Sequence, residues 1–480
     1  MMPISMKSSS IYVNGQYINS HEALERKILN PLGNEESVHL AYLKKNSTHD
    51  QEILGAAIEG ARLSLEDIHS GQIDRAHAIQ SFFFALELEF SKSQDELCSI
   101  LSHEIKKPIR LARLEIERAL GTIKLYKEYA QHINQLSEWK SSPENFHSRQ
   151  RTSGISLAIT PFNFPINLAL HKILPALSWG CPVLWKPSPH AILSSAVLCD
   201  IIHRAKVPAG LFQFIPCDHE LCSELLMNKN IFSLSFTGSD RVAWEIKKKS
   251  EARKMAFELG GNASVWVDKD QDLKKIASEL SKSAFSYGGQ ICIAAQNIYG
   301  TQEVIQELKK ELQESLHLYE AKKLQDTNSL YTCLIDDFAQ EKAQKQHEQL
   351  LKNGAQLVAQ AQQSSAAFPA SIYEVEDLQN SFLHEECFSP QLSLTTLNSF
   401  ESFLEEMKKQ KNKLHLSIYT ANKDQILEAE KLNFGGICVN KAPSTRHDSM
   451  PYGGEENSGI GREGPGYSDE LYSSWQVKVS

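Results

Sequence analysis

The chain lacks the features that mark several common classes of protein. Its 480 residues have a formal net charge of −9, whereas nucleic-acid binding needs a basic face, so we expect no nucleic-acid partner. Its nine cysteines form no CxxC pair and no cluster with histidine, which argues against a metal site and against a secreted disulfide framework. The common dinucleotide fingerprint GxGxxG is absent as well.

No segment predicts a membrane span or an export signal. The longest apolar stretch, roughly residues 155–186, is too interrupted to cross a bilayer, because it contains Pro161, Asn163, Pro165, Lys172 and Pro175. The sequence MMPISMKSSS has no apolar core of the kind that signal peptides carry. We therefore expect a cytoplasmic protein without a membrane partner.

What is present predicts a large α/β protein. A chain of this length exceeds the usual limit of one hydrophobic core, so at least two domains are expected. Helical periodicity covers Ile53–Ile68, Ala76–Phe90 and Leu97–Tyr126. From Ile155 onward strand-like and helix-like runs alternate, which predicts parallel strands with crossover helices. The predicted strands of the first set are Leu157–Thr160, Val183–Lys186, Phe212–Pro216, Leu234–Thr237 and Ser264–Val267, with helices starting near Pro165, His190, His219 and Arg241.

A second alternating set follows from about Glu258. It consists of Leu273–Ser286, Ile298–Tyr299, Gln302–Leu318, Asp336–Asn353, Leu392–Leu397, Phe403–Lys411, Leu416–Thr420 and Ile437–Asn440. Residues Ala359–Ala370 are rich in Gln, Ser and Ala and are expected to form a loop. The second set predicts a second α/β domain.

Three short strings carry candidate chemistry. Cys292 lies in YGGQICI, Glu258 in FELGGN and Asn163 in TPFNFP. Glycines let backbone approach substrate closely, at a conformational cost that a plain core does not require. A lone cysteine is usually a buried core residue, and an asparagine between prolines is ordinarily a turn residue. Taken together, the three indicate a nucleophile, a base and an oxyanion donor.

The ordered motifs PFNFP, LHKILPAL, WKPSP, SFTGS, ELGGN, GQIC, EECFSP, GGICVN and PYGGEENSGIGREG resemble those of the NAD(P)-dependent aldehyde dehydrogenase superfamily. They run in the family's order from about residue 155 to the C-terminus, and IYVNGQYI…NPLGNE and HEIKKPIRLARLEIERA resemble the family less specifically. The motif style is closest to bacterial lactaldehyde, glycolaldehyde and succinate-semialdehyde types. The resemblance implies oxidation of a small, polar aldehyde to its acid.

The resemblance also implies an architecture. It has two doubly wound parallel-sheet domains and a small β extension for oligomerisation. The NAD(P)-binding domain takes residues 1–127 and 155–257, and the catalytic domain takes residues 258–450. The extension takes residues 128–154 and 465–480, with Arg149–Ser153 and Trp475–Val479 as its strands. A homodimer or homotetramer is expected.

Catalytic roles follow from the family's motifs. Cys292 attacks the aldehyde carbon, and the thioester formed after hydride transfer is hydrolysed by water that Glu258 activates. The Asn163 amide and the backbone N–H of Cys292 hold the oxyanion. Lys172 matches a lysine that helps to order Asn163 and the proton network; the alternative is a solvated helix lysine.

The family's cofactor residues map onto Thr160, Pro161, Phe162, Lys186, Gly238, Ser239, Glu386 and Phe388. Lys186 matches a lysine that binds the adenosine ribose, and a merely exposed lysine is the alternative. Ser239 opens a helix whose N–H groups suit phosphate, although it can equally be a plain N-cap. Glu386 and Phe388 match the pair that holds the nicotinamide ribose and ring. Ser389 departs from the glycine that is usual there.

The sequence specifies the choice of cofactor and the substrate less closely than it specifies the catalytic residues. Pro189 stands where NAD-selective relatives often carry a glutamate, so we expect use of both NAD and NADP, with NAD modestly favoured. Arg446 is a candidate partner for a substrate acid, or a residue beside a subunit contact. Two other functions remain open. One is a coenzyme-A-acylating enzyme, against which Glu258 argues, and the other is an idle scaffold, against which the retained catalytic trio argues.

Overall fold

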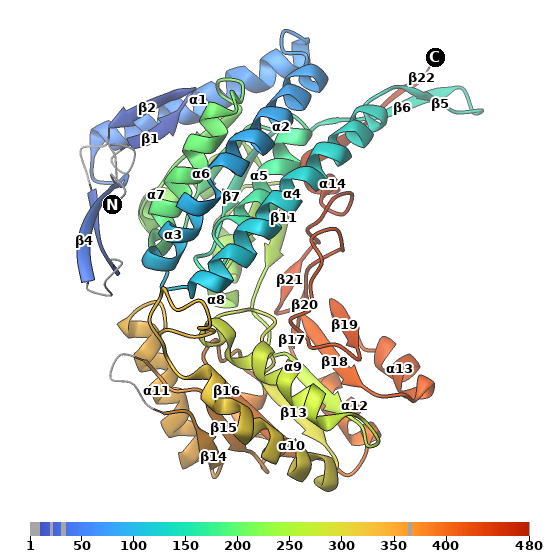
Figure 1. Ribbon diagram of the computed structural model, residues 1–480. Helices are drawn as coiled ribbons and strands as arrows, with labels where there is room; N and C mark the ends of the chain where they lie inside the picture. Colours follow the sequence, from blue (N-terminus) through green and yellow to red (C-terminus); the bar gives the residue numbers. More distant parts are fainter. Residues whose placement is uncertain (1–9, 20–22, 30–34, 363–366, 480) are drawn as a thin grey trace.

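The computed structural model describes residues 10–19, 23–29, 35–362 and 367–479. Figure 1 shows two lobes, each built on a sheet and its helices, and an arm that carries the C-terminus away from both. The N-terminal residues on which the export-signal prediction falls, and most of the NPLGNE motif, lie outside the described residues. Within those residues, no helix combines the length and the apolar character needed to cross a bilayer.

The first lobe is built on an eight-stranded sheet in the order β2-β1-β9-β8-β7-β10-β11-β21. Its central strands β7, β8, β9, β10 and β11 are parallel, as the alternating pattern predicts. Two core clusters of buried apolar side chains flank this sheet. The strands are β1 (Ser10–Val13), β2 (Gln16–Asn19), β7 (Ile155–Ile159), β8 (Val183–Lys186), β9 (Phe212–Phe214), β10 (Ile231–Thr237), β11 (Lys254–Glu258) and β21 (Gly459–Ile460).

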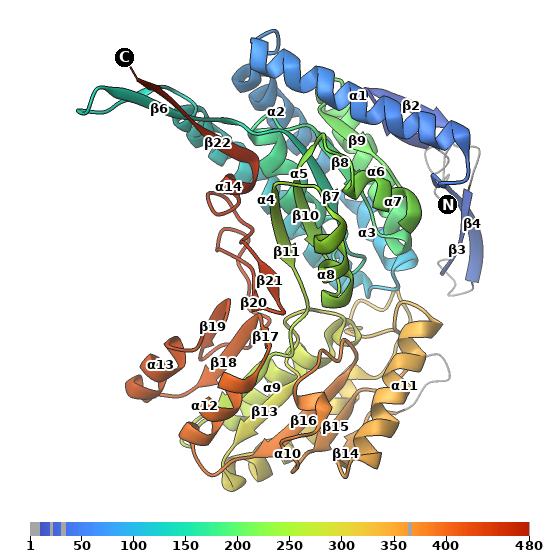
Figure 2. The ribbon, with the colours of Figure 1, turned by 180° about the vertical axis from the view of Figure 1, so that it is seen from behind.

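Helices follow the central strands and cover both faces of the sheet (Figures 1 and 2). Each of the four predicted helix starts is confirmed to within two residues. The crossover helices are α5 (Asn167–Ser178), α6 (Ile192–Arg204), α7 (His219–Leu226) and α8 (Asp240–Lys249). Three long helices and one short helix precede the central strands: α1 (Thr48–Ser70), α2 (Arg75–Lys92), α3 (Gln94–Glu104) and α4 (Ile109–Leu136).

The prediction of one helical stretch over Leu97–Tyr126 is wrong at its middle. The chain breaks between α3 and α4, where Lys106 adopts a φ of 55° and Pro108 precedes the first turn of α4. Proline lacks a backbone donor and restricts the residue before it, so one helix cannot run through this point. The break turns Lys107 inward, where it forms a buried ion pair of 2.5 Å with Glu115.

The second lobe is built on a seven-stranded sheet in the order β14-β15-β16-β13-β12-β18-β19. All of its neighbouring strands are parallel except β14, which is antiparallel to β15. The strands are β12 (Ser264–Val267), β13 (Asn297–Gly300), β14 (Gln356–Gln360), β15 (Ser371–Glu374), β16 (Gln391–Thr396), β18 (His415–Tyr419) and β19 (Gly436–Val439). The helices are α9 (Leu273–Phe285), α10 (Gln302–Ser315), α11 (Asp337–Lys352), α12 (Phe400–Lys409) and α13 (Lys423–Glu430).

The arm is a three-stranded antiparallel sheet of order β22-β6-β5, from β5 (Lys140–Ser141), β6 (Phe146–Thr152) and β22 (Ser473–Val479). Both strands predicted for the extension lie within it, and Trp475 pairs with Gln150. A short helix, α14 (Asp469–Tyr472), leads into β22. In Figures 1 and 2 the arm projects beyond the first lobe, and Trp475 and Val479 on it are 67% and 81% exposed.

Several strands were missed by the sequence analysis. Strand β11, which ends at Glu258, is one, because lysine at its start and glutamate at its end disguise a buried strand. The expected Ala359–Ala370 loop is wrong at its start, where Ala359 and Gln360 belong to β14 and pair with β15. Residues 363–366 of that loop lie outside the described part. Also missed were three antiparallel pairs: β1 with β2, β3 (Ala23–Leu29) with β4 (Glu35–Ala41), and β17 (Asn412–Lys413) with the distant β20 (Glu455–Glu456).

Candidate active site

The three predicted catalytic side chains come from different elements and meet between the lobes. Glu258 ends strand β11, and Asn163 follows strand β7 of the same sheet. Cys292 follows a short helical turn, Ser286–Gly289, in the second lobe. The carboxyl ends of parallel strands share one edge of a sheet, which is where open α/β sheets form their sites. The structure brings all three to the lining of one cavity.

The turn before Cys292 requires its glycines. Tyr287, Gly288 and Gly289 have φ values of 53°, 63° and 67°, the left-handed region that glycine adopts without strain. A Cβ on Gly289 would lie 2.4 Å from the carbonyl oxygen of Ser389, so the chain passes there only without a side chain. The GGQIC motif therefore presents Cys292 on a tightly packed turn.

Cys292 is hydrogen-bonded to a residue that the sequence analysis did not single out. Its Sγ lies 2.9 Å from the hydroxyl of Tyr452. Burial raises the pKa of the Cys292 thiol to about 11, and the hydrogen bond from Tyr452 acts in the opposite direction. The reactive form is the thiolate, so the groups around this sulfur decide its reactivity.

The Asn163 amide is held firmly in place. Its Nδ2 donates to the carbonyl of Gln290 at 2.9 Å, and its Oδ1 accepts from the backbone N–H of Phe164 at 3.1 Å. The carbonyl of Asn163 in turn accepts from the buried Lys107 at 2.6 Å. An amide nitrogen carries two hydrogens, so the bond to Gln290 leaves one for a ligand in the cavity.

Glu258 is buried without a partner. Neither of its carboxylate oxygens has a hydrogen-bond partner among the described residues. Burial, followed by repulsion from the Glu463 carboxylate, raises the pKa of Glu258 well above its ordinary value. A buried, unpaired carboxyl of this kind is costly to keep, and such groups cluster at functional sites.

Lys172 is not a solvated lysine. Its side chain is fully buried, forms an ion pair with Glu463 and donates to the hydroxyl of Ser235 at 3.1 Å. Although burial alone opposes ionisation, Lys172 and Arg446 hold the pKa of Glu463 below its ordinary value. No direct hydrogen bond joins Lys172 to Asn163 among the described residues. Lys172 is therefore paired with Glu463, the acid whose charge contributes to the raised pKa of Glu258.

The predicted cofactor residues divide into two groups. Six line a cavity of about 290 Å³ together with Asn163, Glu258 and Cys292; they are Pro161, Phe162, Gly238, Ser239, Glu386 and Phe388. Thr160 and Lys186 do not line it. Thr160 is buried and accepts a hydrogen bond from the indole of Trp185 at 2.9 Å. Lys186 ends β8 and is buried rather than exposed, with its Nζ 3.3 Å from the Pro187 carbonyl.

The residues of this cavity fit a nicotinamide nucleotide. The Oε1 atom of Glu386 is buried and has no hydrogen-bond partner within the described part of the chain, and burial raises the pKa of Glu386 to about 7. A Cβ on Gly260 would lie 2.4 Å from that carboxyl, so glycine keeps the space open. Phe388, at a φ of 56°, meets Phe162 edge to face at 6.2 Å. Ser239 is the N-cap of α8 but makes no side-chain capping bond.

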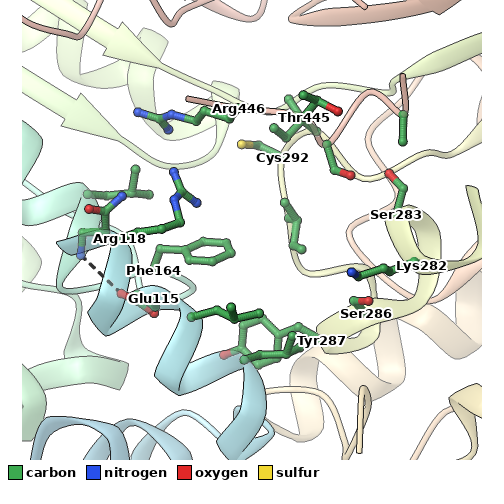
Figure 3. A pocket seen from close by; sticks show the side chains of 18 of the residues that line it. Glu115, Arg118, Phe164, Lys282, Ser283, Ser286, Tyr287, Cys292, Thr445 and Arg446 are labelled. Atoms are coloured by element: carbon green, nitrogen blue, oxygen red, sulfur yellow. Dashed lines mark hydrogen bonds between the residues drawn. The ribbon is translucent and has the colours of Figure 1, made fainter. Parts of the chain in front are cut away.

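A second cavity, of about 520 Å³, is also lined by Cys292 (Figure 3). In that view the Cys292 sulfur points into the same space as Arg118 and Phe164. The cationic residues that line this cavity are Lys107, Arg118, Lys282, Lys441 and Arg446. Lys107 is paired with Glu115, and Arg118 with Asp448. Cys292 therefore belongs to the lining of both cavities.

Arg446 is the cationic residue of this cavity that lies closest to the proposed reaction centre. Its side chain is 8% exposed, its nearest acid oxygen is that of Glu463 at 3.6 Å, and its Nε has no partner among the described residues. The guanidinium stacks on the ring of Tyr452, 3.7 Å from the ring centroid. Sequence analysis named Arg446 as an open question and missed Tyr452, Asp448 and Glu463. Tyr452 and Glu463 lie within the recognised motif PYGGEENSGIGREG, and Asp448 lies in the polar string directly before it.

Comparison with known proteins agrees with this geometry. The model of the aldehyde dehydrogenase family matches residues 25–478. Lactaldehyde dehydrogenase from Methanocaldococcus jannaschii is 31% identical over 471 residues, covering 97% of the chain and 98% of that protein. 3-Sulfolactaldehyde dehydrogenase from Priestia megaterium is 28% identical over 482 residues, covering 99% and 98%.

Solved structures show the same fold. Glyceraldehyde-3-phosphate dehydrogenase from Methanocaldococcus jannaschii, complexed with NADP, has 30% identity and a TM-score of 0.82, covering 88% of this chain and 93% of that one. Betaine aldehyde dehydrogenase from Staphylococcus aureus, in complex with NAD+, has a TM-score of 0.90 over 99% and 97% of the two chains. At 19% identity the latter supports the fold alone.

Proposed function

The chain belongs to the aldehyde dehydrogenase family and is an NAD(P)-dependent oxidoreductase, and we propose that it oxidises a small, polar aldehyde to the carboxylic acid through Cys292. One observation carries the proposal. Cys292 lines both cavities, the one with Glu386 and Phe388 and the one with Arg446. A thiol at that junction can hold an aldehyde carbon between a nucleotide and a substrate pocket.

The chain's own groups supply each step at the carbonyl. The Cys292 sulfur attacks the aldehyde carbon, and the Asn163 amide and the Cys292 backbone N–H receive the oxyanion. NAD(P), when bound, accepts the hydride. Glu258 then takes a proton from the water that hydrolyses the thioester. Its unpaired oxygens and the cavity that it shares with Cys292 support this role.

The raised pKa of Glu258 fits a general base. A carboxylate whose conjugate acid has a raised pKa takes a proton from water more readily. The ion pair of Lys172 with Glu463 lies beside it, and the charge of Glu463 contributes to that raised pKa. We propose that Lys172 and Glu463 hold Glu258 ready to release and regain its proton.

Arg446 favours a substrate with an anionic or strongly polar substituent. It is buried beside the thiol, and its Nε lacks a partner among the described residues. A guanidinium forms paired hydrogen bonds with carboxylate, sulfonate or phosphate oxygens. Two relatives are named for lactaldehyde and 3-sulfolactaldehyde, both of which are small and polar. We propose the same substrate class here.

The larger organisation is also a proposal. We assign residues 1–127 and 155–257 to cofactor binding, 258–450 to catalysis, and 128–154 with 465–480 to an oligomerisation extension. The exposed apolar side chains Trp475, Val477 and Val479 on the arm support a homodimer or homotetramer. A cytoplasmic location is supported by nine free cysteines.

An aldehyde panel tests the proposed function. Lactaldehyde, succinate semialdehyde, 3-sulfolactaldehyde and apolar propionaldehyde are offered with NAD or NADP, with and without coenzyme A. The proposal expects reduced nicotinamide and free acid, independent of coenzyme A, with the polar aldehydes preferred. Strict dependence on coenzyme A would establish the acylating alternative, and no turnover with any aldehyde would favour the idle scaffold.

A single substitution tests the Arg446 assignment. Arg446→Met removes the guanidinium but keeps a long apolar stem, and any effect of the lost charge on the Cys292 thiol slows both aldehydes alike, so the ratio between them isolates the substrate contact. The ratio of kcat/KM for succinate semialdehyde over propionaldehyde should fall about tenfold to a hundredfold, the usual worth of a charge-assisted contact. Lys441→Met, which alters another cation of the same cavity, is the matched control. An unchanged ratio in Arg446→Met refutes the role.

A further inference from the structure

The hydroxyl of Tyr452 is placed on the nucleophile itself. It lies 2.9 Å from Sγ of Cys292, and Tyr452 is 3% exposed. Its backbone is fixed by two reciprocal hydrogen bonds with Glu463, of 3.0 and 2.7 Å. A side chain anchored in this way keeps its hydroxyl at the sulfur without an entropic cost at each turnover.

A cation lies on the ring of the same tyrosine. The Arg446 guanidinium stacks 3.7 Å from the ring centroid, and the His415 ring meets its edge at 5.5 Å. A guanidinium over an aromatic face is attracted by the negative face of the ring. It also withdraws charge from the phenol oxygen, since positive charge nearby favours the ionised form of an acid. Burial still raises the pKa of Tyr452 well above its ordinary value, and the Arg446 charge acts against that, so Arg446 makes this buried phenol a better hydrogen-bond donor than it would be alone.

The nucleophile needs such a donor. Burial disfavours the thiolate of Cys292, and the nearby Glu386 and Glu258 oppose it when they are ionised. Burial also raises the pKa of Glu258, which makes its carboxylate harder to form beside the thiol. Among the groups around Cys292, the Tyr452 hydroxyl and the Arg446 charge are the two that favour the thiolate.

We propose that Tyr452 is a catalytic residue that donates its phenol hydrogen to the Cys292 thiolate, with Arg446 strengthening the donor through the ring. This inference rests on the proposed function of Cys292 as nucleophile. Tyr452 keeps its proton covalently throughout, and the thiol proton leaves to water. When sulfur attacks, its electron pair forms the S–C bond and the carbonyl π pair moves to oxygen. When the thioester is hydrolysed, the C–S pair returns to sulfur, which accepts from Tyr452 again.

The charged and titratable groups around Cys292 and Tyr452 determine whether loss of the phenol hydroxyl raises or lowers the thiol pKa. Cys292 faces Tyr452, Glu386, Arg446 and Glu258, and Tyr452 faces Arg446, Glu258 and His415. Burial lowers the pKa of His415 to about 4, so it is neutral near pH 7 and contributes no charge there. Removing the phenol hydroxyl takes away a group that lowers the thiol pKa. The thiol must then titrate at higher pH.

The test measures the thiol without any aldehyde. Tyr452→Phe keeps the ring and removes only the hydroxyl. Iodoacetamide labelling of the Cys292 peptide, followed by mass spectrometry across pH, should show a midpoint raised by about one to two pH units, the worth of a hydrogen bond to a charged group. Labelling near pH 7 should be about tenfold to a hundredfold slower. Tyr331→Phe, which removes a buried hydroxyl bonded instead to the Phe368 carbonyl, should leave the midpoint in place.

Two further measurements keep the outcome decisive. Arg446→Gln should raise the same midpoint by a smaller amount, and it serves as the test if Tyr452→Phe fails to fold. An unchanged midpoint in the folded variants overturns the inference. Rapid mixing with aldehyde and NAD should show a slower burst of reduced nicotinamide in Tyr452→Phe. If Cys292→Ala retains turnover while the labelling midpoint still shifts, the proposed function fails and the effect of Tyr452 on the thiol stands.

Discussion

Arg118 and Asp448 form a two-pronged ion pair that ties helix α4 to the loop carrying Arg446. The guanidinium donates to the two carboxylate oxygens at 3.1 and 2.7 Å. Asp448 also accepts from the amide of Asn167 at 3.0 Å and lies 3.0 Å from Nε2 of His171, both on helix α5. One carboxylate therefore joins the first lobe to the loop that lines the substrate cavity.

We predict that Asp448→Asn lowers the free energy of unfolding. It should also remove the part of its pH dependence that comes from ionisation of Asp448. Burial opposes ionisation of Asp448, but the bonds from His171 and Arg118 outweigh it and hold its pKa well below 3.8. The ionised Asp448 carboxylate therefore makes its full contribution to the free energy of unfolding above the ordinary pKa. That contribution is lost as pH falls through the lower pKa of the folded state. Urea unfolding at pH 7 should show a loss of about 1.5–3 kcal/mol.

The matched control for this prediction is Asp337→Asn, an exposed acid in the first turn of α11. It should change the free energy of unfolding by no more than about 0.5 kcal/mol, as surface substitutions usually do. Equal effects of the two substitutions would show that the Asp448 network contributes nothing specific.

Cys292→Ala should abolish aldehyde oxidation and leave NAD binding near its normal value. The thiol supplies the covalent step, whereas the residues that fit the nucleotide are carried by other segments. Steady-state absorbance of reduced nicotinamide and fluorescence titration with NAD measure the two properties. Cys98→Ala, in helix α3, should retain most of the activity. Substantial turnover by Cys292→Ala would show that the nucleophile is another group.

Both nicotinamide cofactors should support turnover, with NAD the modest favourite. Pro189 begins a short helical turn after Ser188, so no acid stands there to repel the 2′-phosphate of NADP. A preference for NAD beyond about a thousandfold, roughly 4 kcal/mol, contradicts this expectation. Pro189→Glu should raise the NAD/NADP ratio of kcat/KM about tenfold or more, while Pro189→Gln, of similar size but neutral, should not.

Glu258→Gln should separate hydride transfer from hydrolysis. A variant that lacks only the base still forms the thioester, so rapid mixing should show one burst of reduced nicotinamide and then a steady rate about 100- to 10,000-fold below that of the native enzyme. The acyl group should be detectable on Cys292 by mass spectrometry. A wild-type steady rate with no trapped adduct rules out the assigned role.

The pH dependence of the steady rate gives a second check on Glu258. Because burial raises the pKa of this carboxyl, its basic form appears at a higher pH than in an ordinary glutamate. Where hydrolysis limits turnover, the native steady rate should therefore climb with pH through a midpoint above the ordinary glutamate range. Glu258→Gln should lose that climb.

The sequence by itself determined the family and the alternation of strands and helices, and it pointed to the three residues that we propose for catalysis. Cys292, Glu258 and Asn163 sit in short motifs whose glycines and prolines tolerate few alternatives, and local strings of that kind can be recognised without the fold. Strand β12 falls at its predicted residues, Ser264–Val267, because a buried parallel strand is a continuous apolar run.

Only the tertiary structure decided which charges surround the thiol. Tyr452, Asp448 and Glu463 lie about 150 residues or more from their partners Cys292, Arg118 and Lys172, and no local pattern encodes such pairings. Burial also decided between two open alternatives, since Lys172 and Lys186 could each have been a solvated lysine and are enclosed in the fold. The strength of an acid depends on desolvation and on neighbours brought together by folding, so the chemistry of this site is a property of the packed chain.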